Sequence, residues 1–252
     1  MKKYIKWILL ATISVVNIVS CTRYSGNNSI TQQPTTYSHT KSSRLQEREI
    51  ELSSKKKLQV PIISQNPELK NGCEVTSLAM LLQYSGIEVD KMTLAEQIKK
   101  DTTPLERNDD GTIKSWGDPE VGFVGDITGK EEGFGVYTGP MLELLELYMP
   151  DKGLDLSHQS FERLLQSIDN EKPVIIWVTA DFDKPDSYVE WEKNGKNIKA
   201  TFDEHAVLLV GYNKKYCYIN NPYTGEKNQK ISRKTLEEIW GIMGNMAISY
   251  TL

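Results

Sequence analysis

Apolar and polar positions divide this chain of 252 residues into three parts. After three lysines comes the apolar stretch "WILLATISVVNIV", residues 7–19, which is too short to span a bilayer comfortably and is typical of a secretory signal. We assign that signal to residues 1–20. The following residues are rich in Ser, Thr, Asn and Gln, which predicts a disordered tether over residues 21–57. Apolar patterning begins afterwards, so we predict one folded domain over residues 58–252.

The first half of this domain is predicted to be mainly helical. Residues 71–86, "NGCEVTSLAMLLQYSG", are apolar on most sides and predict a helix that runs through the core. Asn71 can cap its start, and Gly86 can supply the left-handed residue at its end. Three further helices are expected: residues 93–100, where Thr93 and Glu96 are spaced as a capping box, a helix that begins at Pro140, and a helix capped by Ser157.

The second half is predicted to be a sheet. "VIIWV", residues 174–178, has the β-branched content of a buried strand, and Asn194-Gly195 is the hairpin signal within residues 187–202. "HAVLLVGY", "YCYIN" and "NMAISYTL" supply further strands, residues 232–240 a short helix, and residue 58 the start of a short strand. Helices followed by an antiparallel sheet make the expected fold class α+β.

Residues 101–139 contain many Gly, Asp and Thr residues and show little periodicity. We expect a long loop region here, and loops of this length in a compact domain tend to be functional.

Charge follows the same division of the chain. The whole chain carries a net charge of −4, but residues 1–57 carry about +7 and residues 58–252 about −11. An acidic domain argues against nucleic acid as a partner. The basic tether is compatible with anionic lipid head groups, but a solvated linker with no role for its charge is the favoured interpretation.

Two of the three cysteines, Cys73 and Cys217, lie in the domain, which is too few for a disulfide framework, although one bond between them stays open. Cys217 shares a strand face with Ile219 and is expected in the core. The domain lacks C-x-x-C, H-E-x-x-H and Gly-rich phosphate-loop motifs, so no metal or nucleotide site is expected.

Cys73 is the candidate nucleophile because it stands at the predicted start of the core helix. The free amides and the dipole of a helix start favour an anion, which predicts a lowered thiol pKa. A base is also needed, and the domain offers His158, expected on the surface, and His205, which opens a strand. Asn220 and Asn221 end the next strand, and because they alternate faces only one of them can orient the imidazole of His205. Gln65, eight residues before Cys73, could place its amide near an oxyanion.

Five segments together resemble the C39-like family of papain-fold cysteine peptidases, relatives of bacteriocin-leader peptidases. They are "VPIISQNPELKNGCEVTSLAMLLQYSG", "GFVGD", "GFGVY", "HAVLLVGY" and "NNPYTG", the last followed by a helix that ends at Trp240. The resemblance extends over residues 58–252 and implies a papain-like fold. It implies Cys73 as nucleophile, His205 as base, Asn221 as the residue that orients the base, and Gln65 as the oxyanion donor. Many relatives are expected to have Asp where this chain has Asn221.

The resemblance implies hydrolysis of a peptide bond or another amide through a thioester on Cys73, with no metal or organic cofactor. The substrate is expected to be a peptide or protein, and cell-wall peptides are among the candidates. The double-glycine specificity of leader peptidases is not assumed, because no transporter is attached. The alternative is a binding module that keeps the papain-like fold without turnover and presents residues 101–139 to a partner.

"IVSC", residues 18–21, resembles the lipobox of bacterial lipoproteins. The resemblance implies cleavage before Cys21 and attachment of diacylglycerol to its thiol, which would hold the domain on the extracytoplasmic face of the membrane. An ordinary signal with a chance cysteine, or a short anchor, are the alternatives.

Overall fold

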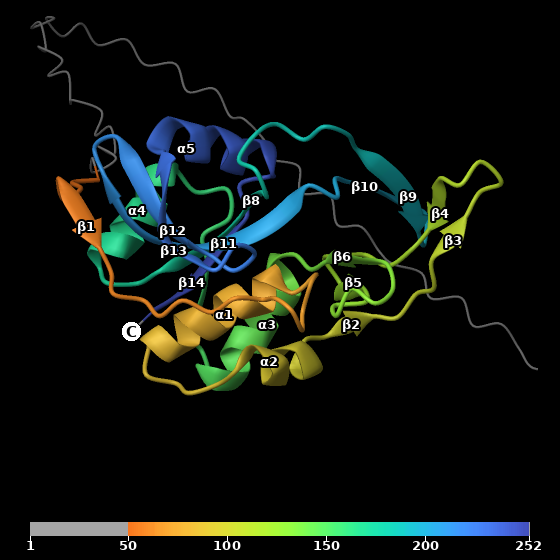
Figure 1. Ribbon diagram of the computed structural model, residues 1–252, viewed down its shortest axis with the longest axis horizontal. Coiled ribbons are helices and arrows are strands. Elements are labelled where there is room, and N and C mark those ends of the chain that lie inside the picture. The colour runs from red at the N-terminus through yellow and green to blue at the C-terminus, as the bar shows by residue number, and fades with distance from the viewer. Residues whose placement is uncertain (1–49, 252) are drawn as a thin grey trace, which may run out of the picture. The chain divides into compact units, whose positions relative to one another are not determined.

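A computed structural model describes residues 50–251 (Figure 1). The predicted signal, Cys21 and the tether up to residue 49 lie outside the described residues. Within residues 50–251 no helix has both the length and the apolar character needed to cross a membrane.

One large antiparallel sheet organises the domain. Its strands are ordered β13-β12-β11-β8-β14-β7, and β1 also pairs with β11. The bounds are β1 (Lys55–Lys57), β7 (Gly153–Asp155), β8 (Val174–Thr179), β11 (Glu204–Asn213), β12 (Tyr216–Asn221), β13 (Glu226–Ser232) and β14 (Ala247–Tyr250). The long strand β11 and the fully buried strand β8 form the centre of the sheet.

Helices cover both faces of this sheet (Figure 1). One group lies against one face and contains α1 (Cys73–Tyr84), α2 (Lys91–Gln97) and α3 (Thr138–Tyr148). On the other face, α4 (Phe161–Asp169) and α5 (Arg233–Ile242) meet through Phe161 and Trp240, whose ring centroids are 5.6 Å apart. The main core lies between these layers, and the predicted α+β class is confirmed.

The boundary of the domain differs from the prediction. Lys55–Lys57, expected in the tether, form β1 and pair with Gly211–Asn213 of β11, while no strand starts at Leu58. β8 pairs with β11 only as far as Leu209, so the remainder of that strand edge is open to a partner. Backbone pairing at an edge needs no apolar side chains, so a run of lysines can supply it.

Helix α1 is the best-predicted helix, apart from its cap. Ten of its residues, Cys73 to Leu82, are buried, and Gly86 ends the helix with a φ of 90°. The cap is not Asn71: its side chain donates to the Asp126 carbonyl instead, and Gly72 stands at the N-cap without a side-chain bond. A Cβ at Gly72 would lie 2.7 Å from the Leu69 Cβ, so glycine permits this tight entry.

Two other predicted caps were also wrong. Asp90, not Thr93, caps α2 and accepts from the Thr93 amide. Ser160, not Ser157, caps α4. Asp and Ser are both favoured at the N-cap, so the local sequence offers more than one starting residue for each of these helices.

The predicted long loop contains short strands instead of irregular chain throughout. β2 (Lys100–Asp101), β5 (Phe123–Gly125) and β6 (Gly133–Gly135) form a small sheet. A second small sheet contains β3 (Glu106–Arg107), β4 (Ile113–Ser115), β9 (Val189–Lys193) and β10 (Lys196–Ala200). The predicted hairpin is confirmed between β9 and β10, with positive φ at Asn194 and Gly195. Trp116, Phe134 and Trp191 belong to a second core cluster beneath these strands.

Candidate active site

Cys73 is the first residue of α1, as predicted, and is only 6% exposed. Its Sγ donates to the Oε2 of Glu74 at 3.3 Å. The sulfur and a carboxyl oxygen of Glu204 in β11 lie within 4.8 Å of each other, and the nearby backbone amide of Ala206 opposes the rise of the thiol pKa. The thiol therefore lies close to the first residue of β11, the strand that carries His205.

His205 and Asn221 are joined directly, across neighbouring strands. The Nε2 of His205 lies 2.9 Å from the Oδ1 of Asn221, and both residues are buried. That oxygen also accepts from the Tyr223 amide at 3.0 Å, which can only donate, and the Nδ2 of Asn221 donates to Gln229 at 2.8 Å. Because the amide orientation is fixed in this way, Nε2 carries the proton and Nδ1 of His205 is left as the acceptor.

The neighbouring Asn220 has a separate role. Its Nδ2 donates to the Pro61 carbonyl at 2.9 Å, and its Oδ1 accepts from the Asn228 amide at 3.1 Å. Asn220 therefore ties the residues that lead to α1 onto the sheet, while Asn221 holds the imidazole. The alternation of faces along a strand leaves the imidazole to Asn221.

Gln65 is held between the two parts of the site. Its backbone amide donates to the Pro222 carbonyl at 2.9 Å, next to Asn221, and its Nε2 donates to the Lys70 carbonyl at 2.6 Å, three residues before Cys73. Lys91 donates to the Gln65 carbonyl at 2.9 Å. The glutamine side chain is buried, and within residues 50–251 its Oε1 has no hydrogen-bond partner.

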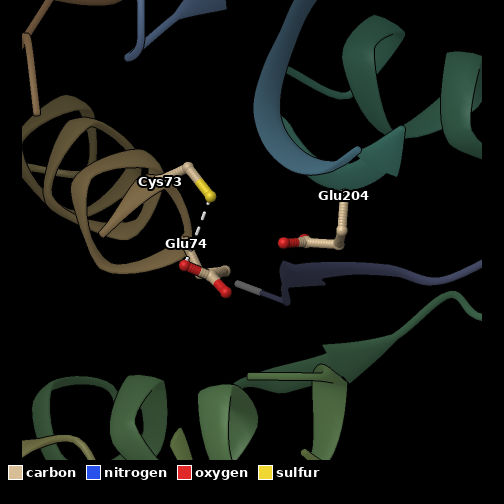
Figure 2. A group of neighbouring side chains, drawn as sticks. All are labelled: Cys73, Glu74 and Glu204. Carbon is tan, nitrogen blue, oxygen red and sulfur yellow. Dashed lines mark hydrogen bonds between the residues drawn. The ribbon is translucent and has the colours of Figure 1, made fainter. Parts of the chain in front are cut away.

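Two carboxyl groups beside the thiol were missed by sequence reasoning. Figure 2 shows the carboxyl groups of Glu74 and Glu204 on either side of the space in front of the Cys73 sulfur. Glu74 is fully buried and its Oε1 accepts from the Val136 amide at 2.8 Å. A signal was present, because Glu74 is a lone charged residue in an otherwise apolar helix, and such a residue needs a partner when buried.

The electrostatics of the thiol contradict the prediction of a lowered pKa. Burial, followed by the nearby Glu74 and Glu204, raises the pKa of Cys73 well above its usual value, against a smaller opposing effect of the Ala206 amide. A helix start acts as roughly half a positive charge, and it is outweighed by burial together with two acidic groups. Burial also lowers the pKa of His205 to about 4, despite the hydrogen bond that its Nε2 donates to Asn221. Thiol and imidazole are therefore both neutral in the resting protein.

Cys73, Glu74 and Glu204 are also a group whose ligand atoms could hold a metal ion, since they lie within 4.8 Å of one another. A metal would need the thiol deprotonated. Here the sulfur donates a hydrogen bond to Glu74, so the thiol keeps its proton. The three groups are therefore arranged to share protons.

The remaining candidates have structural positions. His158 is exposed, as expected, and Cys217 is a free, fully buried cysteine in the core, so no disulfide joins it to Cys73. Trp177 and Trp240 are buried in the main core, and Trp191 in the second cluster.

Comparisons with known proteins agree with this architecture. Residues 57–248 match the Peptidase_C39 like family, so the chain belongs to that family. Its fold is the papain-like α+β fold predicted from the sequence.

Two relatives are similar over most of the domain. A crystal structure from Bacillus anthracis, described as a candidate C39-like peptidase, has 44% sequence identity and a TM-score of 0.71, and the match covers 79% of this chain and 98% of that one. "Uncharacterized protein YvpB" from Bacillus subtilis (strain 168) is 42% identical over 182 residues, which are 72% of this chain and 70% of that protein.

Proposed function

We propose that this protein is a cysteine peptidase or amidase in which Cys73 is the nucleophile and His205 the base. The single observation that carries the proposal is the hydrogen bond from His205 to Asn221, on the strand whose first residue, Glu204, has a carboxyl oxygen within 4.8 Å of the Cys73 sulfur. Nucleophilic catalysis by a thiol requires a cysteine and a histidine oriented by an amide, and this domain carries such a histidine on the strand that packs against the helix of Cys73.

The reaction would start from the neutral pair. His205 Nδ1 takes the thiol proton as Cys73 Sγ attacks the carbonyl carbon of the amide. The amide of Cys73 and the side-chain amide of Gln65 would stabilise the oxyanion, because each is a donor at the helix start. The imidazolium then protonates the leaving amine, and water activated by His205 releases the acyl group from the thioester. Asn221 keeps Nε2 protonated throughout, so Nδ1 stays the free acceptor of the imidazole.

The domain has a hollow beside the start of β11, whose lining does not include Cys73, His205, Asn221 or Gln65. It has a volume of about 470 Å³, and its lining includes Glu120, Tyr137, Tyr188 and Thr201. Thr201 adjoins the start of β11, because its carbonyl accepts from the Glu204 amide at 3.3 Å. The same lining also contains Asp155 and Lys199, so it presents groups of both charge signs to a peptide.

A second candidate function is a binding module without turnover. The raised pKa and the 6% exposure of Cys73 favour it, because a buried thiol that stays protonated reacts poorly.

Digestion of a peptide library decides between the two. Wild-type protein is expected to produce cleavage products identified by mass spectrometry, whereas Cys73→Ala produces none. Cys217→Ala is the matched control, since it removes the other buried thiol and should keep the same cleavage pattern. Identical product lists from wild type and Cys73→Ala would favour the binding module.

We also propose that the domain is held on the extracytoplasmic face of a bacterial membrane by lipid on Cys21, which the lipobox-like residues 18–21 support. Expression with an alkyne-labelled fatty acid should label the wild-type chain, and Cys21→Ser should be unlabelled and released from the membrane fraction. Membrane retention of the Cys21→Ser chain would instead indicate an uncleaved anchor.

A further inference from the structure

Two acidic side chains face each other and the thiol, although one negative charge there would already be costly. Glu74 comes from the start of α1 and Glu204 from the start of β11. One oxygen of each carboxyl and the Cys73 sulfur lie within 4.8 Å of one another (Figure 2). Like charges this close in a buried place cannot all be ionised, so the group must hold protons.

No lysine or arginine of the described part of the chain neutralises the pair. Among residues 50–251, no Lys or Arg forms a salt bridge with either carboxyl. The titratable groups that face the pair are Cys73 on α1 and Tyr137 after β6, and the pKa of Tyr137 is raised by burial and then by Glu204 and other carboxyls. The Oε1 of Glu204 is buried without a hydrogen-bond partner among the described residues.

The surrounding backbone accommodates this pair. Glu74 Oε1 accepts from the Val136 amide, and Trp177 on β8 donates to the Val136 carbonyl at 3.0 Å. Gly135, with φ of 147°, lies beside the carboxyls: a Cβ there would come within 2.5 Å of Glu74 Oε1 and 3.2 Å of Glu204 Oε2. Glycine at position 135 therefore leaves room for the two carboxyl groups, which a side chain at this position of β6 would displace.

We propose that Glu74 is a positioning residue for the nucleophile and that the Glu74–Glu204 pair must retain a proton for Cys73 to become a thiolate. The proposal rests on the proposed function, in which His205 is the group that receives the thiol proton.

In the resting site the thiol proton lies between Cys73 and Glu74, and the carboxyl pair carries at least one further proton. When that thiol proton moves to His205 Nδ1, the retained carboxyl proton turns toward Sγ and donates a hydrogen bond to the new thiolate. If the pair has lost all its protons, the thiolate would face two carboxylates and the transfer is suppressed.

The pH dependence follows from the direction of the pKa shifts. Burial raises the pKa of Glu74 to about 7. Burial and the charge of Glu74 raise the pKa of Glu204 well above its usual value. Raising the pH through neutrality therefore adds negative charge beside the thiol and opposes its ionisation, whereas an isolated thiol simply becomes more reactive.

The test is the alkylation rate of Cys73 by iodoacetamide as a function of pH, followed in the full chain by mass spectrometry of the peptide that contains Cys73. Glu74→Gln mimics the protonated carboxyl, because it keeps an acceptor for Val136 and gains a donor for the sulfur. At about pH 8 this variant is expected to react at least about tenfold faster than wild type, which corresponds to about one pKa unit. Glu204→Gln should shift the profile in the same direction.

Glu143→Gln is the matched control, since Glu143 lies exposed on α3 in a surface ion pair with Lys99. Its profile should coincide with that of wild type. A purely structural role for Glu74 would change stability but leave the pH profile of the thiol unmoved. Profiles of Glu74→Gln and Glu204→Gln that coincide with wild type would overturn the proposal, and Glu204→Gln alone decides it where Glu74→Gln fails to fold.

Failure of the proposal and failure of the proposed function give different results. Alkylation needs no turnover, so a shifted profile in a protein that cleaves no peptide would reject the hydrolase and keep the control of the thiol by Glu74. Peptide cleavage by wild type, together with alkylation profiles that do not shift in the variants, would keep the hydrolase and reject the control of the thiol by Glu74.

Discussion

The two halves of the site are built in opposite ways. In the histidine half, His205, Asn221 and Gln229 form a chain of hydrogen bonds that also includes the Tyr223 amide. In the thiol half, Cys73, Glu74 and Glu204 crowd three acidic groups together, and one carboxyl oxygen has no partner among residues 50–251.

The difference separates orientation from charge. A satisfied chain of neutral groups fixes the ring of His205 without supplying any charge. In the thiol half, negative charge on the three buried acidic groups is unfavourable. That repulsion falls only when a proton is taken up or moved, or when a positively charged group binds nearby. The reactivity of the thiol therefore depends on the thiol half. The direction of proton transfer depends on the histidine half.

The largest expected effect comes from removing the base. His205→Ala should lower kcat/KM by about a thousandfold or more, because it removes the proposed acceptor of the thiol proton. Hydrolysis of a peptide found in the library digest measures this effect. The control is His158→Ala, which removes the exposed histidine and should leave kcat/KM within about twofold of wild type. Equal losses in both variants would remove His205 from the mechanism.

Asn221→Ala should be the next largest change, with kcat reduced about 10- to 100-fold because the imidazole loses its orienting bond and a buried Nε2–H is left unpaired. Asn221→Asp should retain orientation and add a negative charge that raises the pKa of His205 from about 4, so the acidic limb of the kcat/KM profile should move to higher pH. A limb that moves to lower pH in Asn221→Asp would contradict this arrangement.

In the thiol half, the ionisation of Glu74 should make the free energy of unfolding depend on pH. The folded pKa of Glu74, about 7, lies above that of an exposed glutamate, so its contribution to stability is present at low pH and is lost as the pH rises through 7. Glu74→Gln should therefore gain about 2 kcal/mol relative to wild type between about pH 5 and pH 8. Urea unfolding at both pH values measures it. A constant difference between the two proteins would show that Glu74 does not titrate in this range.

The smallest effect is expected at the far end of the histidine half. Gln229→Ala removes only the acceptor for Asn221 Nδ2, while the Tyr223 amide still fixes Oδ1, so kcat should fall less than about fivefold. A loss as large as that of Asn221→Ala, measured on the same peptide, would show that the chain acts as one unit.

The sequence predicted elements that depend on local patterns. The buried strand β8, the Asn194-Gly195 hairpin and the end of α1 at Gly86 were confirmed, because periodicity and turn residues determine them locally. Asn71 and Ser157 were wrong as caps, and the strands within residues 101–139 were missed. These features depend on contacts with distant residues, such as the bond from Asn71 to Asp126.

The same limit applies to the site. Cys73, His205, Asn221 and Gln65 were proposed from spacing and resemblance, and the contact between His205 and Asn221 needs only neighbouring strands in register. The predicted lowering of the thiol pKa was wrong because it considered the helix start alone. Glu204 lies 131 positions after Cys73, and only the packing of α1 on β11 brings the two together.

The most direct test of the central claim is a search for an acyl-thioester on Cys73. A peptide ester that carries the sequence of a cleaved peptide is mixed with the protein, quenched in acid after one turnover time and digested for mass spectrometry. The account predicts an acyl adduct on the Cys73 peptide of wild type, with more adduct in Glu74→Gln at about pH 8 and none in His205→Ala. Product release without any adduct on Cys73, or an adduct on Cys217, would contradict it.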